Sequence, residues 1–181
     1  MKRNRTLDYA ITLLDNDYYH VLEFGVNSGH TIKQLRNSLS DQYKLFGFDS
    51  FEGLPEDWTG TTAKKGSMST NGVIPDIEGV TFYKGWFVDT IPKYKQVAQP
   101  IALLHVDCDL YSSTIDVLYG LKDFIQSNTV IVFDEWYYNH NDIPQHRLHE
   151  QKAFYEWVKD FNINYTGYPL IEDERKIIKI V

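Results

Sequence analysis

Short apolar runs alternate with longer amphipathic segments along the chain, and this alternation predicts the order of its strands and helices. The run Ile101–Val106 is unbroken, which is typical of a central parallel strand that is covered on both faces. The predicted strands are residues 20–24, 44–49, 80–84, 101–106, 129–133, 162–168 and 176–181. The predicted helices are residues 6–14, 31–39, 88–96, 113–125 and 145–161.

This order predicts a doubly wound, Rossmann-like α/β sheet that is mostly parallel and has helices on both faces. Only a short acidic turn, Glu172–Glu174, separates the last two strands, so we expect them to be antiparallel. Gly60–Gly79 is rich in Gly, Ser, Thr and Lys and is predicted to be a long surface loop. With no linker or internal repeat, we expect one domain over residues 1–181.

Acidic residues lie at the carboxyl ends of four predicted strands. These residues are Glu23, Asp49, Asp107 and Asp134. In a doubly wound sheet, ligands bind beyond the carboxyl ends of the strands. We therefore expect the functional site at this edge of the sheet.

The first predicted strand leads into a glycine turn, Gly25–Gly29, which is followed by a helix. Glycine lets a ligand approach the backbone closely, and Asp49 can accept hydrogen bonds from both hydroxyls of a ribose. The pattern therefore favours a nucleoside-containing cofactor. His30 stands where the third glycine of the dinucleotide motif would be, which counts against an NAD- or nucleotide-sugar-binding oxidoreductase. A structural turn without a ligand is the remaining alternative.

Four longer motifs follow the second to fifth strands. They are Asp49–Pro55 (DSFEGLP), Lys84–Pro92 (KGWFVDTIP), His105–Thr114 (HVDCDLYSST) and Val130–Glu135 (VIVFDE). Together with the glycine turn, this set resembles the macrocin O-methyltransferase-like branch of the class I S-adenosylmethionine (SAM) methyltransferases. The resemblance covers the chain from Tyr19 onward and implies a seven-stranded sheet whose last strand is antiparallel. It also implies SAM as the cofactor.

The resemblance implies a SAM site built from the glycine turn and the segments that follow the second, third and fourth strands. We expect Gly85 to allow close approach of the adenine, and Trp86 either to stack on it or to pack in the core together with Phe87. The expected cofactor-binding residues are Glu23, Gly25, Val26, Asn27, Ser28, Gly29, Asp49, Ser50, Phe51, Gly85, Trp86 and Asp107.

Four acids should converge at the ends of the fourth and fifth strands: Asp107, Asp109, Asp134 and Glu135. Clustered carboxylates are costly unless a cation or protons neutralise them. By resemblance to metal-dependent O-methyltransferases, Asp107, Asp134 and Glu135 are the expected ligands of Mg²⁺ or another divalent cation. Such an ion would bind a substrate hydroxyl and lower its pKa. Asp107 and Asp109 are the expected catalytic residues, with Asp109 as a candidate general base.

Three alternatives remain for these acids. Asp109 could instead cap the helix that begins near Ser113, and Asp134 and Glu135 could bind backbone amides. The enzyme could also be metal-independent, with Asp109 or His105 as the base. Finally, the domain could bind SAM without turnover, because the N-terminal helical cover of the macrocin enzymes is almost absent here.

Composition restricts the partners. The net charge of −7 argues against nucleic acid, and no apolar stretch is long enough to span a membrane. The single cysteine, Cys108, cannot form an intrachain disulfide, so we expect a cytoplasmic protein. Acids flank Cys108, which argues against a nucleophilic role. We expect a ring-bearing or polyhydroxylated small-molecule acceptor, near the long loop and Trp136–Tyr138, and a homo-oligomer. His140, His146 and His149 are expected at the surface.

Overall fold

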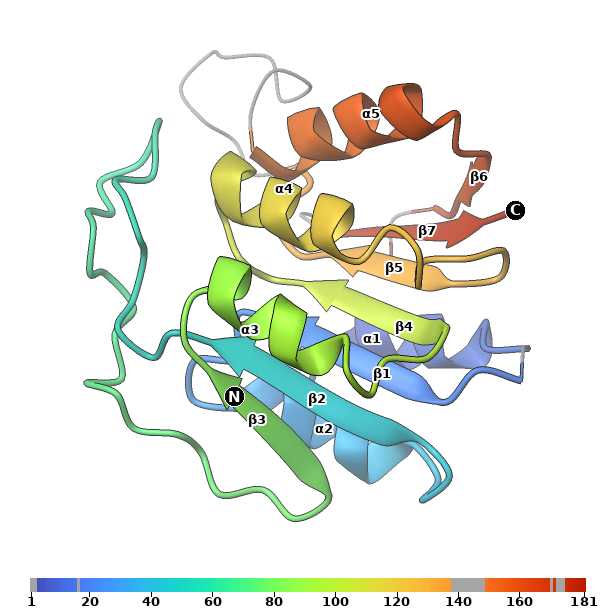
Figure 1. The fold of residues 1–181 in the computed structure, drawn as a ribbon, viewed down its shortest axis with the longest axis horizontal. Coiled ribbons are helices and arrows are strands. Elements are labelled where there is room, and N and C mark those ends of the chain that lie inside the picture. Colours follow the sequence, from blue (N-terminus) through green and yellow to red (C-terminus); the bar gives the residue numbers. More distant parts are fainter. Residues whose placement is uncertain (1–2, 16, 138–148, 170, 172–174) are drawn as a thin grey trace.

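A computed structural model describes residues 3–15, 17–137, 149–169, 171 and 175–181 of the chain (Figure 1). In this part the strands are β1 (His20–Phe24), β2 (Lys44–Asp49), β3 (Val80–Lys84), β4 (Ile101–Val106), β5 (Val130–Phe133), β6 (Tyr165–Gly167) and β7 (Lys176–Ile180). The helices are α1 (Arg5–Thr12), α2 (His30–Ser38), α3 (Phe87–Tyr94), α4 (Tyr111–Gly120) and α5 (His149–Phe161).

The seven strands form one sheet in the order β3-β2-β1-β4-β5-β7-β6. Strands β1 to β5 are parallel to one another, whereas β7 is antiparallel to both β5 and β6. The prediction of a seven-stranded, doubly wound sheet with an antiparallel last strand is therefore confirmed. Strand order reverses between β1 and β4, which is where ligands bind in sheets of this kind.

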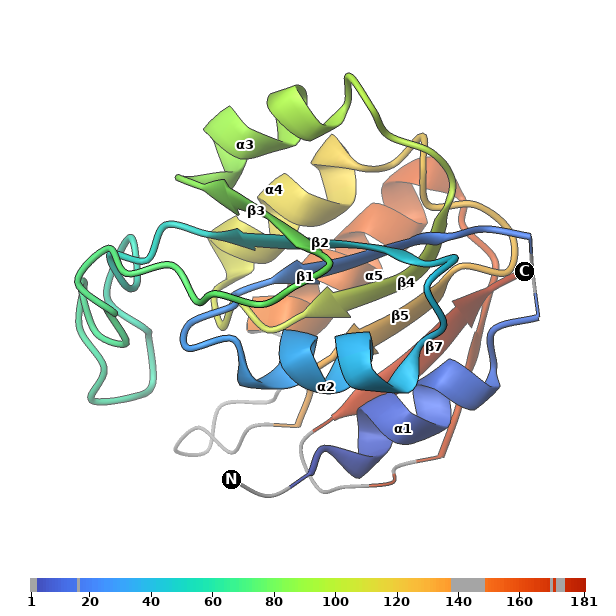
Figure 2. The same cartoon turned by 90° about the horizontal axis from the view of Figure 1, so that it is seen from below.

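Helices cover both faces of the sheet (Figure 2). Helices α3, α4 and α5 lie on one face, and α1 and α2 lie on the other. Each face has its own apolar core, with side chains such as Leu104 and Phe133 in the first and Val21 and Val132 in the second. Every residue of β1, β4 and β5 is buried, so the polar side chains of Glu23 and His105 lie inside the protein.

Strand boundaries agree with the predicted ones to within one residue except in β6, which spans Tyr165–Gly167 where residues 162–168 were predicted. Helices α1, α2 and α3 differ by one or two residues at each end, and α4 differs by more. Helix α4 begins at Tyr111 and ends at Gly120, where residues 113–125 were predicted. Helix α1 begins earlier than predicted, because the side chain of Asn4 caps it by accepting a hydrogen bond from the Leu7 amide (3.0 Å). Residues 145–148 of the last predicted helix and the predicted turn 172–174 lie outside the described residues.

The connection between β2 and β3 contains no helix or strand and runs beyond the carboxyl ends of these strands, at the left of Figure 1. Its own hydrogen bonds fold it: Leu54 and Ser67 pair through their backbones (2.9 Å), as do Gly66 and Leu54 (2.9 Å). The predicted loop 60–79 is thus confirmed as part of a longer connection that begins directly after Asp49.

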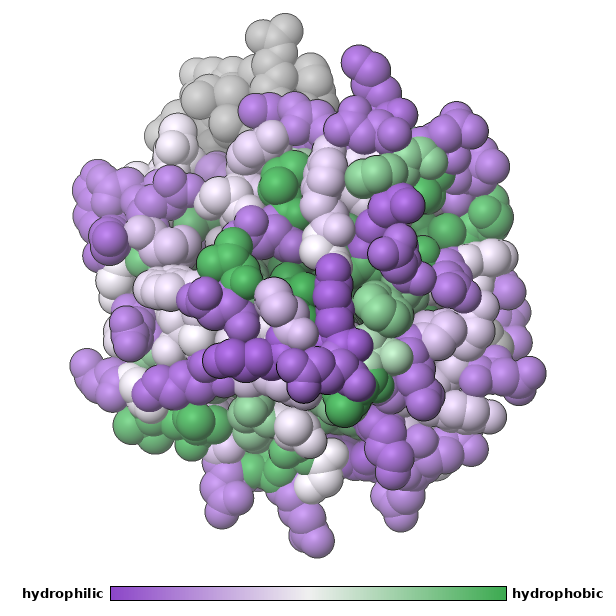
Figure 3. Space-filling model, in the orientation of Figure 1, coloured by the Kyte–Doolittle hydropathy of each residue, from purple (hydrophilic) through white to green (hydrophobic). Residues whose placement is uncertain are grey.

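Hydrophilic side chains cover most of the face that carries α3, α4 and α5, and hydrophobic ones show only as small patches between them (Figure 3). Among the described residues, no helix is both long enough and apolar enough to cross a membrane.

Candidate active site

Backbone hydrogen bonds align the ends of four neighbouring strands. The Gly25 amide donates to the Phe48 carbonyl (2.9 Å), the Asp107 amide to Phe24 (2.9 Å) and the Asp134 amide to Val106 (3.0 Å). The segments that follow β1, β4 and β5 therefore leave the sheet side by side. The predicted convergence of the acids follows directly from this parallel register.

Gly25 lets the turn after β1 pass close to the end of β4. Its φ is +92°, and a Cβ added there would lie 1.6 Å from the carbonyl oxygen of Asp107. No other residue type fits at this position without moving one of the two segments. The glycine that we interpreted as a point of ligand approach is thus also required for contact within the protein.

A cavity of about 810 Å³ lies beyond these strand ends. Its wall comes from the glycine turn, the β2–β3 connection, the start of α3, the segment after β4 and the first turns of α4. Eight of the predicted cofactor residues line it: Gly25, Val26, Asn27, Ser28, Asp49, Ser50, Trp86 and Asp107. The predicted catalytic residue Asp109 and the predicted metal ligand Glu135 line it as well.

Four predicted cofactor residues are not among those that line the cavity. Glu23 is fully buried beneath it, and Phe51 packs in the core beside Phe82. Gly29 is packed against Pro75 and Ile77, and Gly85 against Thr90. Trp86 is 38% exposed and lines the cavity, and Phe87 both lines it and packs edge-on against Phe24.

Asp49 holds the two turns that flank the cavity. Its carboxylate accepts hydrogen bonds from the backbone amides of Asn27 (2.7 Å) and Phe51 (2.6 Å), one at each oxygen. Both donors have a positive φ, 48° and 60°, so these bonds stabilise two unfavourable backbone conformations. A carboxylate has about four acceptor positions, which leaves Asp49 able to accept ribose hydroxyls as predicted.

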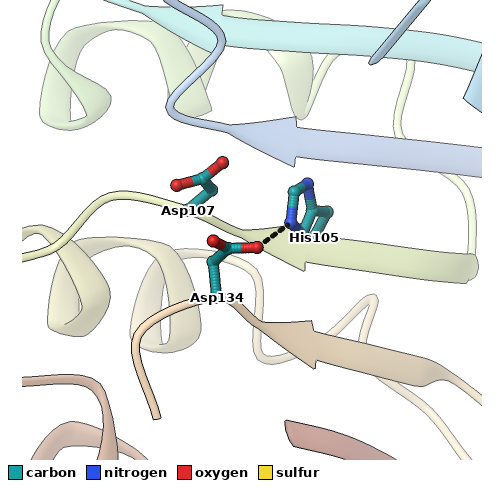
Figure 4. Close-up of side chains that lie close together, drawn as sticks. All are labelled: His105, Asp107 and Asp134. Carbon is teal, nitrogen blue, oxygen red and sulfur yellow. Dashed lines mark hydrogen bonds and ion pairs between the residues drawn. The ribbon is translucent and has the colours of Figure 1, made fainter. Parts of the chain in front are cut away.

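Charged side chains form a continuous set of contacts at the strand ends, and Figure 4 shows one of them, between His105 and Asp134. Glu23 accepts a hydrogen bond from the Thr31 hydroxyl (2.9 Å) and contacts His105 Nδ1 (2.9 Å), and His105 Nε2 contacts Asp134 (3.4 Å). Arg175 in turn donates to Asp134 through Nη2 (3.0 Å). We call Glu23, His105, Asp134 and Arg175 the partnered chain.

The partnered chain fixes the charges of its members. Burial would lower the pKa of His105, but its hydrogen bonds to Asp134 and Glu23 raise that pKa well above the ordinary value, so the imidazole is protonated. Burial would raise the pKa of Asp134, but His105 and Arg175 lower it to about 2. His105 is therefore a fully buried histidine whose two ring nitrogens both contact carboxylates.

A second set of acids lies beside this chain with few partners. Burial and then the charge of Asp134 raise the pKa of Asp107 well above its usual range. Burial, followed by Asp134 and Asp49, raises the pKa of Asp109 to about 7. Burial and nearby acids also raise the pKa of Glu135, whose Oε2 is buried and has no hydrogen-bond partner in the part of the chain that the structure describes. We call Asp107, Asp109 and Glu135 the open group.

The alternatives for these acids can now be compared with their surroundings. Asp109 does not cap α4, because the N-cap of α4 is Leu110 and no side chain caps that helix. Instead, Asp109 is the middle residue of a tight turn, with φ of 63°, closed by the hydrogen bond from Leu110 to Cys108 (2.6 Å). Asp134 binds side chains rather than backbone amides.

Three further expectations concern neighbouring residues. The expectation of a surface position for His149 was wrong: it is buried, and its Nε2 donates to the Thr59 carbonyl (3.0 Å). Burial, followed by Glu150, raises the pKa of Cys108, which agrees with an inert thiol. Trp136 is buried against Phe154 of α5 and does not line the cavity. His140, His146 and Tyr138 lie outside the described residues.

Several residues of the site were missed from the sequence. Glu150 of α5 is fully buried, and its Oε2 accepts the Glu135 amide (3.1 Å). Arg175 was overlooked because it adjoins the predicted acidic turn. Asp116 lines the cavity one helical turn after Ser112, whose hydroxyl donates to Glu56 (2.6 Å) across to the β2–β3 connection. The sequence held one signal for Asp116: its spacing of four residues from Ser112 places both side chains on the same face of a helix.

Comparison with known proteins gives two kinds of match. The model of the macrocin O-methyltransferase (TylF) family matches residues 75–154, which is 80 of the 181 residues. No curated protein matches the chain. The solved structure of CalS11, calicheamicin methyltransferase, is similar with 19% identity and a TM-score of 0.76, and the match covers 97% of this chain and 77% of that one.

Two further O-methyltransferase structures are similar. NovP has 20% identity and a TM-score of 0.73, with 97% of this chain and 79% of that chain covered. The Bacillus cereus O-methyltransferase, solved in complex with S-adenosylhomocysteine (SAH), has 15% identity and a TM-score of 0.59, with 100% and 92% covered. The fold is that of the class I methyltransferases.

The match to the TylF family model, over 80 of the 181 residues, and the neighbouring folds support a SAM-dependent O-methyltransferase that is similar to the TylF family. This match includes the motifs after β3, β4 and β5, and the motif after β2 lies outside it. The resemblance predicted from the motifs is thereby confirmed, and the comparisons favour a methyltransferase over the oxidoreductase alternative.

Proposed function

We propose that this enzyme methylates a hydroxyl group of a small polyhydroxylated molecule with the assistance of a divalent cation, and that residues 1–181 form one methyltransferase domain. The single observation that carries the proposal is the arrangement of acids around one cavity. Asp49 stands on the wall near the glycine turn, and the open group stands at the ends of β4 and β5. Cofactor and acceptor can thus meet in one cavity.

The residues that bind the cofactor follow from the contacts of the cavity wall. We assign the ribose to Asp49, the aminoacid end to the glycine turn and the adenine to the side of Ser50 and Trp86. Bound SAM supplies an electrophilic methyl group on its sulfonium. Because Glu23 has both oxygens occupied by Thr31 and His105, we assign it to supporting the turn from beneath rather than to direct contact.

The open group suits a hard divalent cation. Mg²⁺ and Mn²⁺ prefer carboxylate oxygens, and Oε2 of Glu135, which is buried and has no hydrogen-bond partner among the described residues, is such a donor. We propose Asp107 and Glu135 as two ligands; the third is Asp134, as the resemblance implies, or Asp109. When bound, the ion would lower the pKa of a substrate hydroxyl beside it. The acids would hold the acceptor oxygen in line with the cofactor, so that positioning supplies much of the rate.

One observation favours a second mechanism without metal. The pKa of Asp109 is raised to about 7 by burial, Asp134 and Asp49, and a carboxylate of that pKa suits proton acceptance at neutral pH. Chelation separates the two mechanisms. With metal assistance, activity disappears in EDTA and returns with Mg²⁺ or Mn²⁺. Unchanged turnover in EDTA would leave Asp109 as the base.

The proposed acceptor class comes from related enzymes and from the cavity. CalS11 is a TDP-rhamnose 3′-O-methyltransferase in calicheamicin biosynthesis. Serine hydroxyls, acids and Trp58 line the present cavity, and such side chains can bind a sugar through hydrogen bonds and ring contacts. Incubation with SAM and a panel of sugars, nucleotide sugars and catechols should produce SAH only with accepted substrates.

The cofactor assignment has an independent test. Calorimetry with SAH should give an affinity that falls by about tenfold to a hundredfold in Asp49→Ala, because two hydrogen bonds to a charged group are lost. Glu52→Ala, an exposed acid three residues further along, is the matched control and should bind normally. Equal affinity in both variants would refute the ribose assignment.

A further inference from the structure

Two neighbouring helices give the cavity one apolar wall and one polar wall. The apolar wall comes from the start of α3 and consists of Trp86, Phe87 and Val88. The polar wall comes from the first turns of α4 and consists of Ser112, Ser113 and Asp116. A flat ring with polar groups on its edge suits such a pair of walls, because its face and its edge need different partners.

The packing of α3 against α4 determines which residues meet at this end of the cavity. The two helices lie side by side, and each connects two parallel strands, so both begin at the carboxyl edge of the sheet (Figure 1). Gly120 of α4 packs against Ile91 of α3: a Cβ added at Gly120 would lie 3.1 Å from Cδ1 of Ile91. One helical turn earlier in the two helices are Asp116 and Phe87. Asp116 therefore lies opposite the apolar wall.

The carboxylate of Asp116 is available to a ligand. It lines the cavity, is partly buried and has no hydrogen-bond or ion-pair partner in the described part of the chain. Burial alone raises its pKa, without a contribution from a neighbouring charge. Ser112, one turn earlier, differs because its hydroxyl donates to Glu56 (2.6 Å). Since an ionised carboxylate can only accept hydrogen bonds, the group that Asp116 suits is a donor.

The cofactor assignment places the adenine at this end of the cavity. The Gly85 amide donates to the Asp49 carbonyl (2.9 Å), so the ribose assigned to Asp49 lies next to Trp86, the first residue of the apolar wall. The base attached to that ribose can then lie against the aromatic side chains of this wall. Adenine carries an exocyclic amine, which is a hydrogen-bond donor, and the apolar wall offers this amine no side-chain acceptor.

We propose that Asp116 recognises the base of the cofactor, and that its carboxylate accepts a hydrogen bond from the exocyclic amine of the adenine. Asp116 is thus a specificity-determining residue of the cofactor site that α4 contributes from across the cavity. The inference rests on the proposed cofactor assignment. A base with a carbonyl oxygen in place of the amine would direct one acceptor at another and would bind more weakly.

Calorimetry with two ligands tests this role without an acceptor substrate. One ligand is SAH, and the other is S-inosylhomocysteine, in which a carbonyl oxygen replaces the exocyclic amine of the base. The unmodified enzyme should bind SAH about tenfold or more tightly than S-inosylhomocysteine. The measured quantity is the ratio of the two affinities. Both ligands are titrated into the same sample, so partial unfolding of a variant does not alter this ratio.

We expect Asp116→Asn to reduce the preference for SAH to less than about threefold, because an amide can either accept from the amine or donate to the carbonyl oxygen. Glu56→Gln is the matched control, since it also replaces a carboxylate of the cavity wall with its amide. The preference for SAH in Glu56→Gln should equal that of the unmodified enzyme.

Three results would overturn the inference and leave the cofactor assignment standing. The unmodified enzyme could bind both ligands equally, Asp116→Asn could retain the full preference for SAH, or Glu56→Gln could lose as much of that preference as Asp116→Asn. Failure of the unmodified enzyme to bind either ligand would overturn the cofactor assignment and this inference together.

Discussion

The partnered chain and the open group lie side by side at the ends of β4 and β5, and both contain buried acids, yet their energetics are opposite. Each acid of the partnered chain faces a cation: Glu23 faces His105, and Asp134 faces His105 and Arg175. Asp109 and Glu135 of the open group face other acids instead. The first arrangement is complete without a ligand, whereas the second becomes favourable only when a proton or a cation is bound.

The difference shows how a rigid site can be built next to a reactive one. Hydrogen bonds within the partnered chain hold the ends of three strands in register, and none of its members is among the residues that line the cavity. The open group is supported by that scaffold and retains free oxygens that line the cavity. Buried charge thus supports the architecture in one place and the chemistry in the other.

Replacing His105 should have the largest effect, because it leaves Glu23 and Asp134 buried without their shared cation. We expect His105→Leu to lower the free energy of unfolding by about 3–5 kcal/mol, measured by urea denaturation. His20→Leu is the control: His20 is also buried, but it hydrogen-bonds the neutral Tyr94 hydroxyl (2.8 Å) and packs against Phe46, and burial lowers its pKa. Equal losses in both variants would mean that the charges of the partnered chain contribute little.

Neutralising an acid of the open group should raise the free energy of unfolding instead of lowering it. The raised pKa of Asp109, about 7, means that its stabilising protonated form is fully present below about pH 3.8 and is lost as the pH rises through 7. In EDTA at pH 8, Asp109→Asn should therefore stabilise the protein by roughly 2–4 kcal/mol. The gain should vanish near pH 4. Destabilisation at pH 8 would show that Asp109 has an unrecognised partner.

Removing the outer cation of the partnered chain should have an intermediate effect. The pKa of Asp134 is held at about 2, so its ionised form contributes stability above about pH 3.8 that is lost as the pH falls through 2. Arg175→Met should cost about 1–3 kcal/mol at pH 7 and move acid unfolding to higher pH.

Arg3→Met is the matched control for Arg175→Met. Arg3 forms an ion pair with Asp8 (2.6 Å) at the surface, where solvent screens the interaction, so its loss should be hardly measurable. Similar thermal shifts in the two variants would contradict a special role for the buried pair.

The smallest effect is expected at the edge of the cavity. Asp116 has no cationic partner among the described residues, and burial raises its pKa, but it is only partly buried. Asp116→Asn should therefore stabilise the metal-free protein at pH 8 by a small fraction of the Asp109→Asn effect. Scanning calorimetry in EDTA would detect it, and a gain as large as that of Asp109→Asn would extend the open group to α4.

The strands and the acids at their ends could be predicted from the sequence for a simple physical reason. A parallel sheet with both faces covered requires unbroken apolar runs, and the last residue of each run marks the same edge. Asp107 and Asp134 therefore had to meet once β4 and β5 were recognised. The β2–β3 connection was also recognisable from its composition, although its role as a wall of the cavity was not.

The partners of the acids could not be predicted in the same way. Glu23 and His105 lie in strands that are buried on both faces, so no alternation indicates which way their side chains point. The contact of Arg175 with Asp134 joins residues that are far apart in the sequence, and nothing near Arg175 indicates it. Glu150 required knowledge of how α5 packs over the end of β5. Each of these contacts depends on how segments far apart in the sequence pack together.

The contact between Gly25 and the Asp107 carbonyl has a consequence for engineering this enzyme. The glycine turn, which we propose to bind the cofactor, and Asp107 touch through their backbones, with no side chain between them to absorb a change. Directed evolution of one half of the site will therefore disturb the other, so libraries that aim at new acceptors should leave Gly25 fixed. Randomised positions are better chosen in the β2–β3 connection, which lines the same cavity and takes no part in the contact between Gly25 and Asp107.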